Sequence, residues 1–261
     1  MDKIKRTPII AGNWKMNLTG AKAGALIKEL RPLCSGTGCE VLVCPPFTAL
    51  DSAAKALKGS SIKLGAQNCH WEQKGAFTGE ISAEMLADIG TEYVIIGHSE
   101  RRQYFGETDE TVNKRLRAAL GGGLKVILCV GETLDEKENG QTTQVIYRQL
   151  TAALAEVSTK ELARVVIAYE PVWAIGTGKT ATPELAGEVC GFVRGVLTGI
   201  YDMDTSYTVR ILYGGSMNAA NAKDLLAQYD IDGGLIGSAS LKAGDFAAIV
   251  AAAAASDSTN V

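Results

Sequence analysis

The chain of 261 residues carries 26 basic and 29 acidic side chains, which gives a formal net charge of −3, and 46% of its residues are hydrophobic. This composition excludes a disordered chain, which would be poorer in apolar residues and more one-sided in charge. No basic run predicts a nucleic-acid partner or an anionic membrane surface, and no apolar stretch approaches the roughly 20 residues of a membrane helix.

Short apolar runs bounded by Gly, Pro or Asn recur along the chain and predict eight strands. The runs are nearly continuous in Val, Ile, Leu and Ala, which is typical of parallel strands that are covered on both faces. They span residues 8–12, 40–44, 62–66, 93–97, 125–130, 164–169, 209–213 and 233–237.

Segments of helical composition alternate with these strands. Thr182 before Pro183 is a typical helix start, and the glycines at 121–123 are a typical helix end. The predicted helices span residues 19–34, 50–57, 111–120, 134–157, 183–201, 219–228 and 245–255, with a longer, less regular stretch at 68–91.

The regular alternation of strands and helices predicts the fold class. Length alone allows one domain or two, because α/β barrels fill about 200 to 250 residues as one domain. No linker or charge run divides the chain. An open doubly wound sheet usually has a Gly-rich dinucleotide fingerprint after its first strand, and this chain has none there. We therefore expect an α/β protein of one domain, residues 1–261, folded as a closed (β/α)₈ barrel.

Polar side chains follow several of the predicted strands, and in a barrel these strand ends meet at one rim. Asn13 and Lys15 follow the first strand, His98 the fourth and Glu170 the sixth. Each has an ordinary alternative, as a solvated lysine, a structural histidine or a loop glutamate. Together, a carboxylate, an imidazole and a cation supply proton abstraction, proton delivery and anion stabilisation.

Glycine-rich turns follow the seventh and eighth predicted strands. Gly214, Gly215 and Ser216 follow the seventh, and Gly237 and Ser238 follow the eighth. Barrels often bind phosphate at these two loops, where backbone N–H groups can approach an anion closely. The alternative, tight turns that need positive φ, is equally compatible with the sequence.

A third glycine-rich segment resembles part of a nucleotide-binding loop but fails the full pattern. Gly178-Lys179-Thr180 ends such a motif, yet the glycine required five residues before the Gly-Lys pair is replaced by Trp173. The segment does not predict ATP binding.

The six cysteines form no C-x-x-C pair, and only two histidines accompany them, so a zinc site is not expected. The first residues contain no apolar stretch long enough for a signal peptide. We therefore expect a cytoplasmic protein with free thiols. The sequence does not show whether Cys129 or Cys190 reacts with oxidants.

Four long motifs, in order, resemble the triosephosphate isomerase family, and the likeness extends from Pro8 to Phe246. They are Asn13-Trp14-Lys15-Met16-Asn17, Ile96-Gly97-His98-Ser99-Glu100-Arg101-Arg102, the run from Ala168 to Lys179, and Tyr213-Gly214-Gly215-Ser216. The resemblance implies a TIM barrel that interconverts dihydroxyacetone phosphate and D-glyceraldehyde 3-phosphate, in glycolysis and gluconeogenesis, without a cofactor or metal.

The resemblance also implies roles for individual residues. Glu170 would be the base that moves a proton between neighbouring carbons, and His98 would polarise the carbonyl and shuttle protons between the oxygens of the enediol(ate). A neutral histidine paired with a glutamate base is the arrangement described for this family itself. Lys15 and Asn13 would stabilise the oxyanion. The phosphate would be held by Gly176, Ser216, Gly237 and Ser238.

Further expectations concern the surroundings of these residues. Glu100 is expected to pair with Lys15 and orient it, with a plain surface salt bridge as the alternative. By resemblance, residues 171–181 form a lid that excludes water from the enediolate. Residues 68–80 form a loop that docks into a second subunit, with Thr78 near the partner's Asn13 region, so a homodimer is expected. Packing of this loop on its own barrel is the alternative.

The departures from the family pattern, which include Cys69-His70 at the start of the dimer loop, leave the catalytic groups intact. Ser238 follows Gly237 where many members have a second glycine, and Leu18 stands where glycine is frequent. Two other functions stay open: a sugar-phosphate-binding barrel without isomerase activity, and an aldolase that uses Lys15 to form a Schiff base.

Overall fold

The computed structural model describes residues 6–175 and 180–258, and the side chains of its last helix as far as residue 255. Its strands form one closed barrel in chain order, with every neighbouring pair parallel and β1 pairing with both β2 and β8. The strands are β1 (Ile9–Asn13), β2 (Glu40–Cys44), β3 (Lys63–Ala66), β4 (Tyr93–Ile96), β5 (Lys125–Val130), β6 (Val165–Tyr169), β7 (Ile211–Tyr213) and β8 (Gly233–Ile236).

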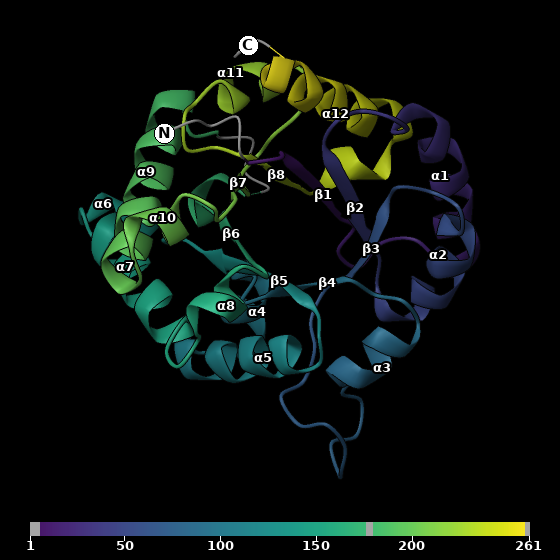
Figure 1. Ribbon diagram of the computed structural model, residues 1–261, viewed down its shortest axis with the longest axis horizontal. Coiled ribbons are helices and arrows are strands. Elements are labelled where there is room, and N and C mark those ends of the chain that lie inside the picture. The colour runs from purple at the N-terminus through teal and green to yellow at the C-terminus, as the bar shows by residue number, and fades with distance from the viewer. Residues whose placement is uncertain (1–5, 176–179, 259–261) are drawn as a thin grey trace.

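Helices surround the barrel as an outer ring, which Figure 1 shows end-on. The α-helices are α1 (Gly20–Leu33), α2 (Leu50–Leu57), α3 (Ala83–Asp88), α4 (Ser99–Phe105), α5 (Asp109–Gly121), α6 (Leu134–Glu138), α7 (Thr142–Ala153), α8 (Thr159–Leu162), α9 (Pro183–Ile200), α10 (Met203–Ser206), α11 (Ala222–Leu226) and α12 (Ala243–Ser258). The described part of the chain also forms the 3₁₀ helices η2 (Phe47–Ala49), η3 (Val172–Ala174) and η4 (Ser238–Leu241). The predicted (β/α)₈ barrel of one domain is confirmed.

Two apolar layers hold the fold together. The inner layer consists of strand residues alone, and it therefore fills the inside of the barrel. The outer layer joins the opposite strand faces to the helices, and it contains Ile10 and Val43 from strands together with Ile27 from α1. Strands buried on both faces explain why the sequence shows continuous apolar runs instead of alternation.

Several predicted boundaries are confirmed, and others are wrong. The Thr182 side chain caps α9 by accepting the Leu185 N–H, and Pro183 occupies the first helical position. The single helix expected at 134–157 is instead α6 and α7, separated at Gly140, whose φ is 69°. A left-handed glycine is a common helix end, and Asn139-Gly140 was the overlooked signal. The stretch at 68–91 contains α3.

None of the helices in the described ranges is both long and apolar enough to cross a membrane. All six cysteines are free, five of them buried and Cys39 half-buried. Burial raises the pKa of the Cys34 thiol to about 11, and it also raises the pKa of Cys129 and Cys190. High thiol pKa values and burial both oppose reaction with oxidants.

Candidate active site

The strand ends that carry the predicted polar residues meet around one cavity of about 400 Å³. Its lining includes seven of the nine expected site residues: Asn13, Lys15, His98, Glu170, Ser216, Gly237 and Ser238. Glu100 does not line the cavity but contacts Lys15 from α4, and Gly176 lies outside the described residues. Residues from β1, β4, β6, β7 and β8 therefore converge on one rim.

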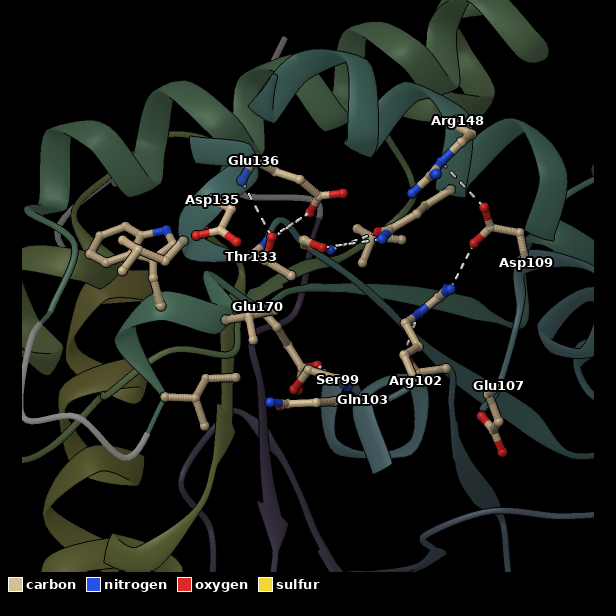
Figure 2. A pocket seen from close by; sticks show the side chains of 18 of the residues that line it. Ser99, Arg102, Gln103, Glu107, Asp109, Thr133, Asp135, Glu136, Arg148 and Glu170 are labelled. Carbon is tan, nitrogen blue, oxygen red and sulfur yellow. Dashed lines mark hydrogen bonds and ion pairs between the residues drawn. The ribbon is translucent and has the colours of Figure 1, made fainter. Parts of the chain in front are cut away.

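Glu170 lies between two elements that fix its carboxylate. Its backbone N–H donates to the Val130 carbonyl at 2.7 Å, which extends the β5–β6 pairing to the rim. Its Oε2 accepts the Ser99 N–H of α4 at 2.8 Å, and Oε1 lies 2.9 Å from His98 Nε2. Figure 2 shows the carboxylate turned toward Ser99. Because Glu170 is only 2% exposed, these contacts replace those that water would provide.

His98 caps the N-terminus of α4. Its Nδ1 accepts the Glu100 N–H at 3.2 Å, so this nitrogen offers a lone pair. The proton of a neutral ring then lies on Nε2, which faces Glu170. An imidazole that presents N–H to the cavity is suited to polarise a substrate oxygen.

The two partners shift each other's pKa. Burial raises the pKa of Glu170, but the adjacent His98 and the Ser99 N–H outweigh burial, and the net direction is downward. Burial lowers the pKa of His98, but the Glu170 carboxylate outweighs it, and the net direction is upward. The free site therefore favours an ionised base at neutral pH.

Lys15 carries the fixed cation of the site. Its Nζ lies 2.5 Å from Glu100 Oε1, which confirms the expected pairing. Its side chain is 27% exposed and Glu100 is 37% exposed, so the pair is partly desolvated at the cavity edge. Asn13 contributes through its Oδ1, which accepts the Lys15 N–H at 3.0 Å.

The glycine-rich turns after β7 and β8 line the same cavity. Gly214, Gly215 and Gly237 do not have positive φ, so the alternative explanation by strained turns is wrong for them. Gly214 instead allows close packing, because an added Cβ would lie 2.8 Å from Glu170 Cγ. Ser216 Oγ donates to the Ala174 carbonyl at 2.9 Å and thereby joins the turn after β7 to η3.

Ser238 and Leu18, which depart from the family pattern, have different environments. Ser238 is exposed and begins η4, and Gly237 precedes it as the capping residue. The first N–H groups of such a helix have no partner within it. Leu18 has a φ of 70°, a left-handed conformation that glycine adopts more readily than leucine.

Glu132, which the sequence analysis missed, contacts Trp173 of η3 and Tyr169 of β6 next to the site. It lies two residues beyond β5 and is 1% exposed, and its Oε1 accepts both the Trp173 indole N–H at 2.8 Å and the Tyr169 hydroxyl at 3.1 Å. Lys137 Nζ lies 3.1 Å from the centroid of the Trp173 ring. Burial raises the pKa of Glu132. Its position at a strand end was the available signal.

A second cavity of about 870 Å³ adjoins the first and shares Glu170 with it. Residues of α4, α6 and η3 contribute to its lining. Figure 2 shows this cavity, with Glu170 and Ser99 on one side and Thr133 and Glu136 on another. Its arginines are paired: Arg102 Nη1 lies 2.7 Å and Arg148 Nε 3.4 Å from the Asp109 carboxylate. Within residues 6–175 and 180–258, no group of three or more His, Cys, Asp or Glu side chains could hold a metal ion.

Comparison with known proteins gives one consistent match. A family model described as triosephosphate isomerase matches residues 8–253. A triosephosphate isomerase of Geotalea uraniireducens (strain Rf4) is 54% identical over 246 residues, which cover 94% of this chain and 98% of the relative. One from Alkaliphilus metalliredigens (strain QYMF) is 56% identical over 245 residues, which cover 94% of this chain and 99% of the relative.

Proposed function

The chain belongs to the triosephosphate isomerase family, and on that premise we propose how its residues interconvert dihydroxyacetone phosphate and D-glyceraldehyde 3-phosphate. The protein is an isomerase, and its reaction is a step of glycolysis. The observation that carries the assignment of roles is the buried carboxylate of Glu170 beside His98 Nε2, in the cavity that Lys15 also lines.

Glu170 is the base in this proposal. Its carboxylate takes the proton from the carbon next to the substrate carbonyl, and the electron pair of that C–H bond forms the enediolate. The same carboxylate then returns the proton to the neighbouring carbon. The burial of Glu170 supports this role, because a carboxylate without surrounding water is already partly desolvated for proton transfer.

His98, Lys15 and Asn13 stabilise the oxygens of the intermediate. His98 donates from Nε2 to the carbonyl oxygen and moves protons between the two enediol oxygens. The Lys15 ammonium offsets the developing negative charge, with Glu100 holding it at the cavity edge. Asn13 holds the backbone of Lys15 and lines the same cavity.

The phosphate is bound by Ser216, Gly237 and Ser238, which line the cavity, with Gly176 from the segment outside the described residues. The support is their shared lining of one cavity and the first N–H groups of η4, which have no partner within that helix. Residues 171–181 act as a lid in this proposal. The contacts of Trp173 with Glu132 and Lys137 support a defined resting position for its first turn.

A homodimer in the cytoplasm completes the proposal. The loop at 68–80 projects beyond the barrel between α3 and α5 (Figure 1), and Phe77 on it is 41% exposed. Trp71, in contrast, packs beside Arg115 of its own barrel. For this residue the alternative expectation, that the loop packs on its own barrel, holds. Six free cysteines support a reducing compartment.

The two other candidate functions fit the geometry less well. An aldolase needs Lys15 as a neutral amine nucleophile, whereas its ammonium is paired with Glu100. A binding barrel without activity would not need a base and an imidazole in contact. A reducible adduct between Lys15 and the substrate would favour the aldolase.

The test is a coupled assay of glyceraldehyde 3-phosphate isomerisation with variants of the proposed groups. Glu170→Asp withdraws the carboxylate by one methylene and is expected to lower kcat by on the order of 100-fold or more, with little change in KM. Glu29→Asp, on the exposed face of α1, is the matched control. Unchanged turnover in Glu170→Asp would remove Glu170 from the role of base.

A further inference from the structure

Lys15 adopts a backbone conformation that its side chain does not favour. Its φ is 51°, in the left-handed region that residues with a Cβ rarely occupy. Such a conformation persists only where the surroundings hold it, and it is often found at functional sites. Some contact must therefore hold this backbone, and the contact determines where the ammonium points.

Gln67 makes that contact from the neighbouring part of the barrel. It follows β3 directly and is half-buried. Its Nε2 donates to the Lys15 carbonyl at 2.8 Å and to the Cys44 carbonyl at 2.8 Å. An amide nitrogen has two hydrogens, so both are used. Because Cys44 is the last residue of β2, one side chain ties the Lys15 loop to two strand ends.

The peptide groups on both sides of Lys15 are thereby fixed. Its N–H is held by Asn13 Oδ1 at 3.0 Å, and its carbonyl is held by Gln67. The preceding residue is anchored as well, because the Trp14 N–H donates to the Cys44 carbonyl at 3.1 Å. Without Gln67, the carbonyl is released, and the residue can relax to negative φ, which redirects its Cβ and the ammonium.

We propose that Gln67 is a positioning residue of the isomerase, which holds Lys15 in its left-handed conformation and aims its ammonium into the active-site cavity. The inference rests on the proposed electrostatic role of Lys15. Gln67 itself does not line the cavity, so it acts through Lys15 and not on the substrate.

The experiment is a double-mutant cycle on kcat/KM. Gln67→Met keeps the shape of the side chain and removes both donors, and it is expected to lower kcat/KM by on the order of 10-fold to 100-fold. In the Lys15→Ala background, the same substitution is expected to change kcat/KM less than about 3-fold, because the group that Gln67 positions is gone. Gln67→Glu, which also lacks the donors, repeats the cycle if Gln67→Met does not fold.

A matched control separates positioning from general stability. Asn113 of α5 also donates to two carbonyls, those of Ala153 and Ala155, at 2.9 Å each. Asn113→Leu removes an equivalent pair of hydrogen bonds outside the site, and it is expected to lower the Tm without changing kcat/KM. For variants whose turnover is too low to measure, the same cycle is carried out on the affinity for inorganic phosphate, measured by calorimetry.

The outcomes distinguish the two proposals. Normal kinetics in Lys15→Ala would overturn the role of Lys15 and, with it, this inference. If Lys15→Ala is impaired but Gln67→Met has wild-type kcat/KM and phosphate affinity, only the inference about Gln67 fails. It fails equally if Gln67→Met has the same effect in both backgrounds, because Gln67 then acts independently of Lys15.

Discussion

At the scale of single residues, the contact of 2.9 Å between His98 Nε2 and Glu170 Oε1 controls the protonation of both groups. Burial alone lowers the pKa of His98, and the carboxylate reverses this direction. In Glu170→Gln the carboxylate is gone and burial dominates, so the pKa of His98 is expected to fall below its ordinary value of 6.5. The chain has two histidines, so ¹⁵N NMR of labelled histidine can follow this titration directly.

The same pair predicts the sign of a stability change with pH. The raised pKa of folded His98 contributes stability that is complete below about pH 6.5 and is lost as the pH rises through the folded pKa. In Glu170→Gln the lowered pKa reverses the sign, and this group now costs stability as the pH falls through 6.5. Urea unfolding across this range measures the effect. A His98 resonance that titrates at the same pH in both proteins would contradict the explanation.

The sequence could predict which polar residues meet at the candidate site, but not the residues that hold them. Glu170, His98 and Lys15 follow strands, and the barrel topology alone brings strand ends together. Gln67 and Glu132 also follow strands, but their roles depend on which backbone groups and rings they reach. Those partners are distant in sequence, so no local pattern reveals them.

At the scale of elements, Gly214 sets how closely the end of β7 approaches Glu170. The Gly214 N–H donates to the Tyr169 carbonyl at 2.7 Å, and an added Cβ would lie 2.8 Å from Glu170 Cγ and 3.1 Å from that carbonyl. Gly214→Ala is therefore expected to displace the carboxylate and lower kcat by on the order of 10-fold or more, at a stability cost of about 1–3 kcal/mol.

The control for this prediction is a glycine with space around it. Gly195 lies on the exposed side of α9 with nothing within 4 Å of an added Cβ. Gly195→Ala is expected to stabilise the protein by about 0.5–1 kcal/mol and leave kcat unchanged. Denaturant unfolding and the coupled assay measure both variants. Full activity in Gly214→Ala would show that Glu170 tolerates the added methyl group.

The elements themselves were largely predictable, and the errors have local or long-range causes. The break between α6 and α7 is local, because Gly140 takes a left-handed conformation. The start of β7 at Ile211, two residues later than expected, has a long-range cause. The Ile211 N–H donates to the buried Asp232 carboxylate, which Arg6 and Arg194 also contact. Periodicity cannot show a strand boundary that a distant side chain sets.

At the scale of the whole molecule, closure of the barrel accounts for how a single chain folds. It does not account for the loop at 68–80, whose tip projects beyond the barrel (Figure 1). His70 N–H donates to the Ile81 carbonyl at 2.8 Å, so the neck of the loop is fixed. The His70 ring lies 4.7 Å from the Phe77 ring, and Phe77 is still 41% exposed. An ordered loop with an exposed aromatic tip is typical of an interface.

The proposed homodimer gives the prediction at this scale. The wild-type protein is expected to sediment at twice the mass of the chain, and Phe77→Glu is expected to weaken association by about 30-fold or more, because it places a charge where an aromatic group would be buried. Tyr147→Glu, at a 57% exposed aromatic residue of α7, is the matched control and should leave the dimer intact. If the loop docks beside the partner's site, kcat/KM of Phe77→Glu falls on dilution in parallel with dissociation. A wild-type protein that sediments as a monomer with full activity would contradict both the dimer and this role of the loop.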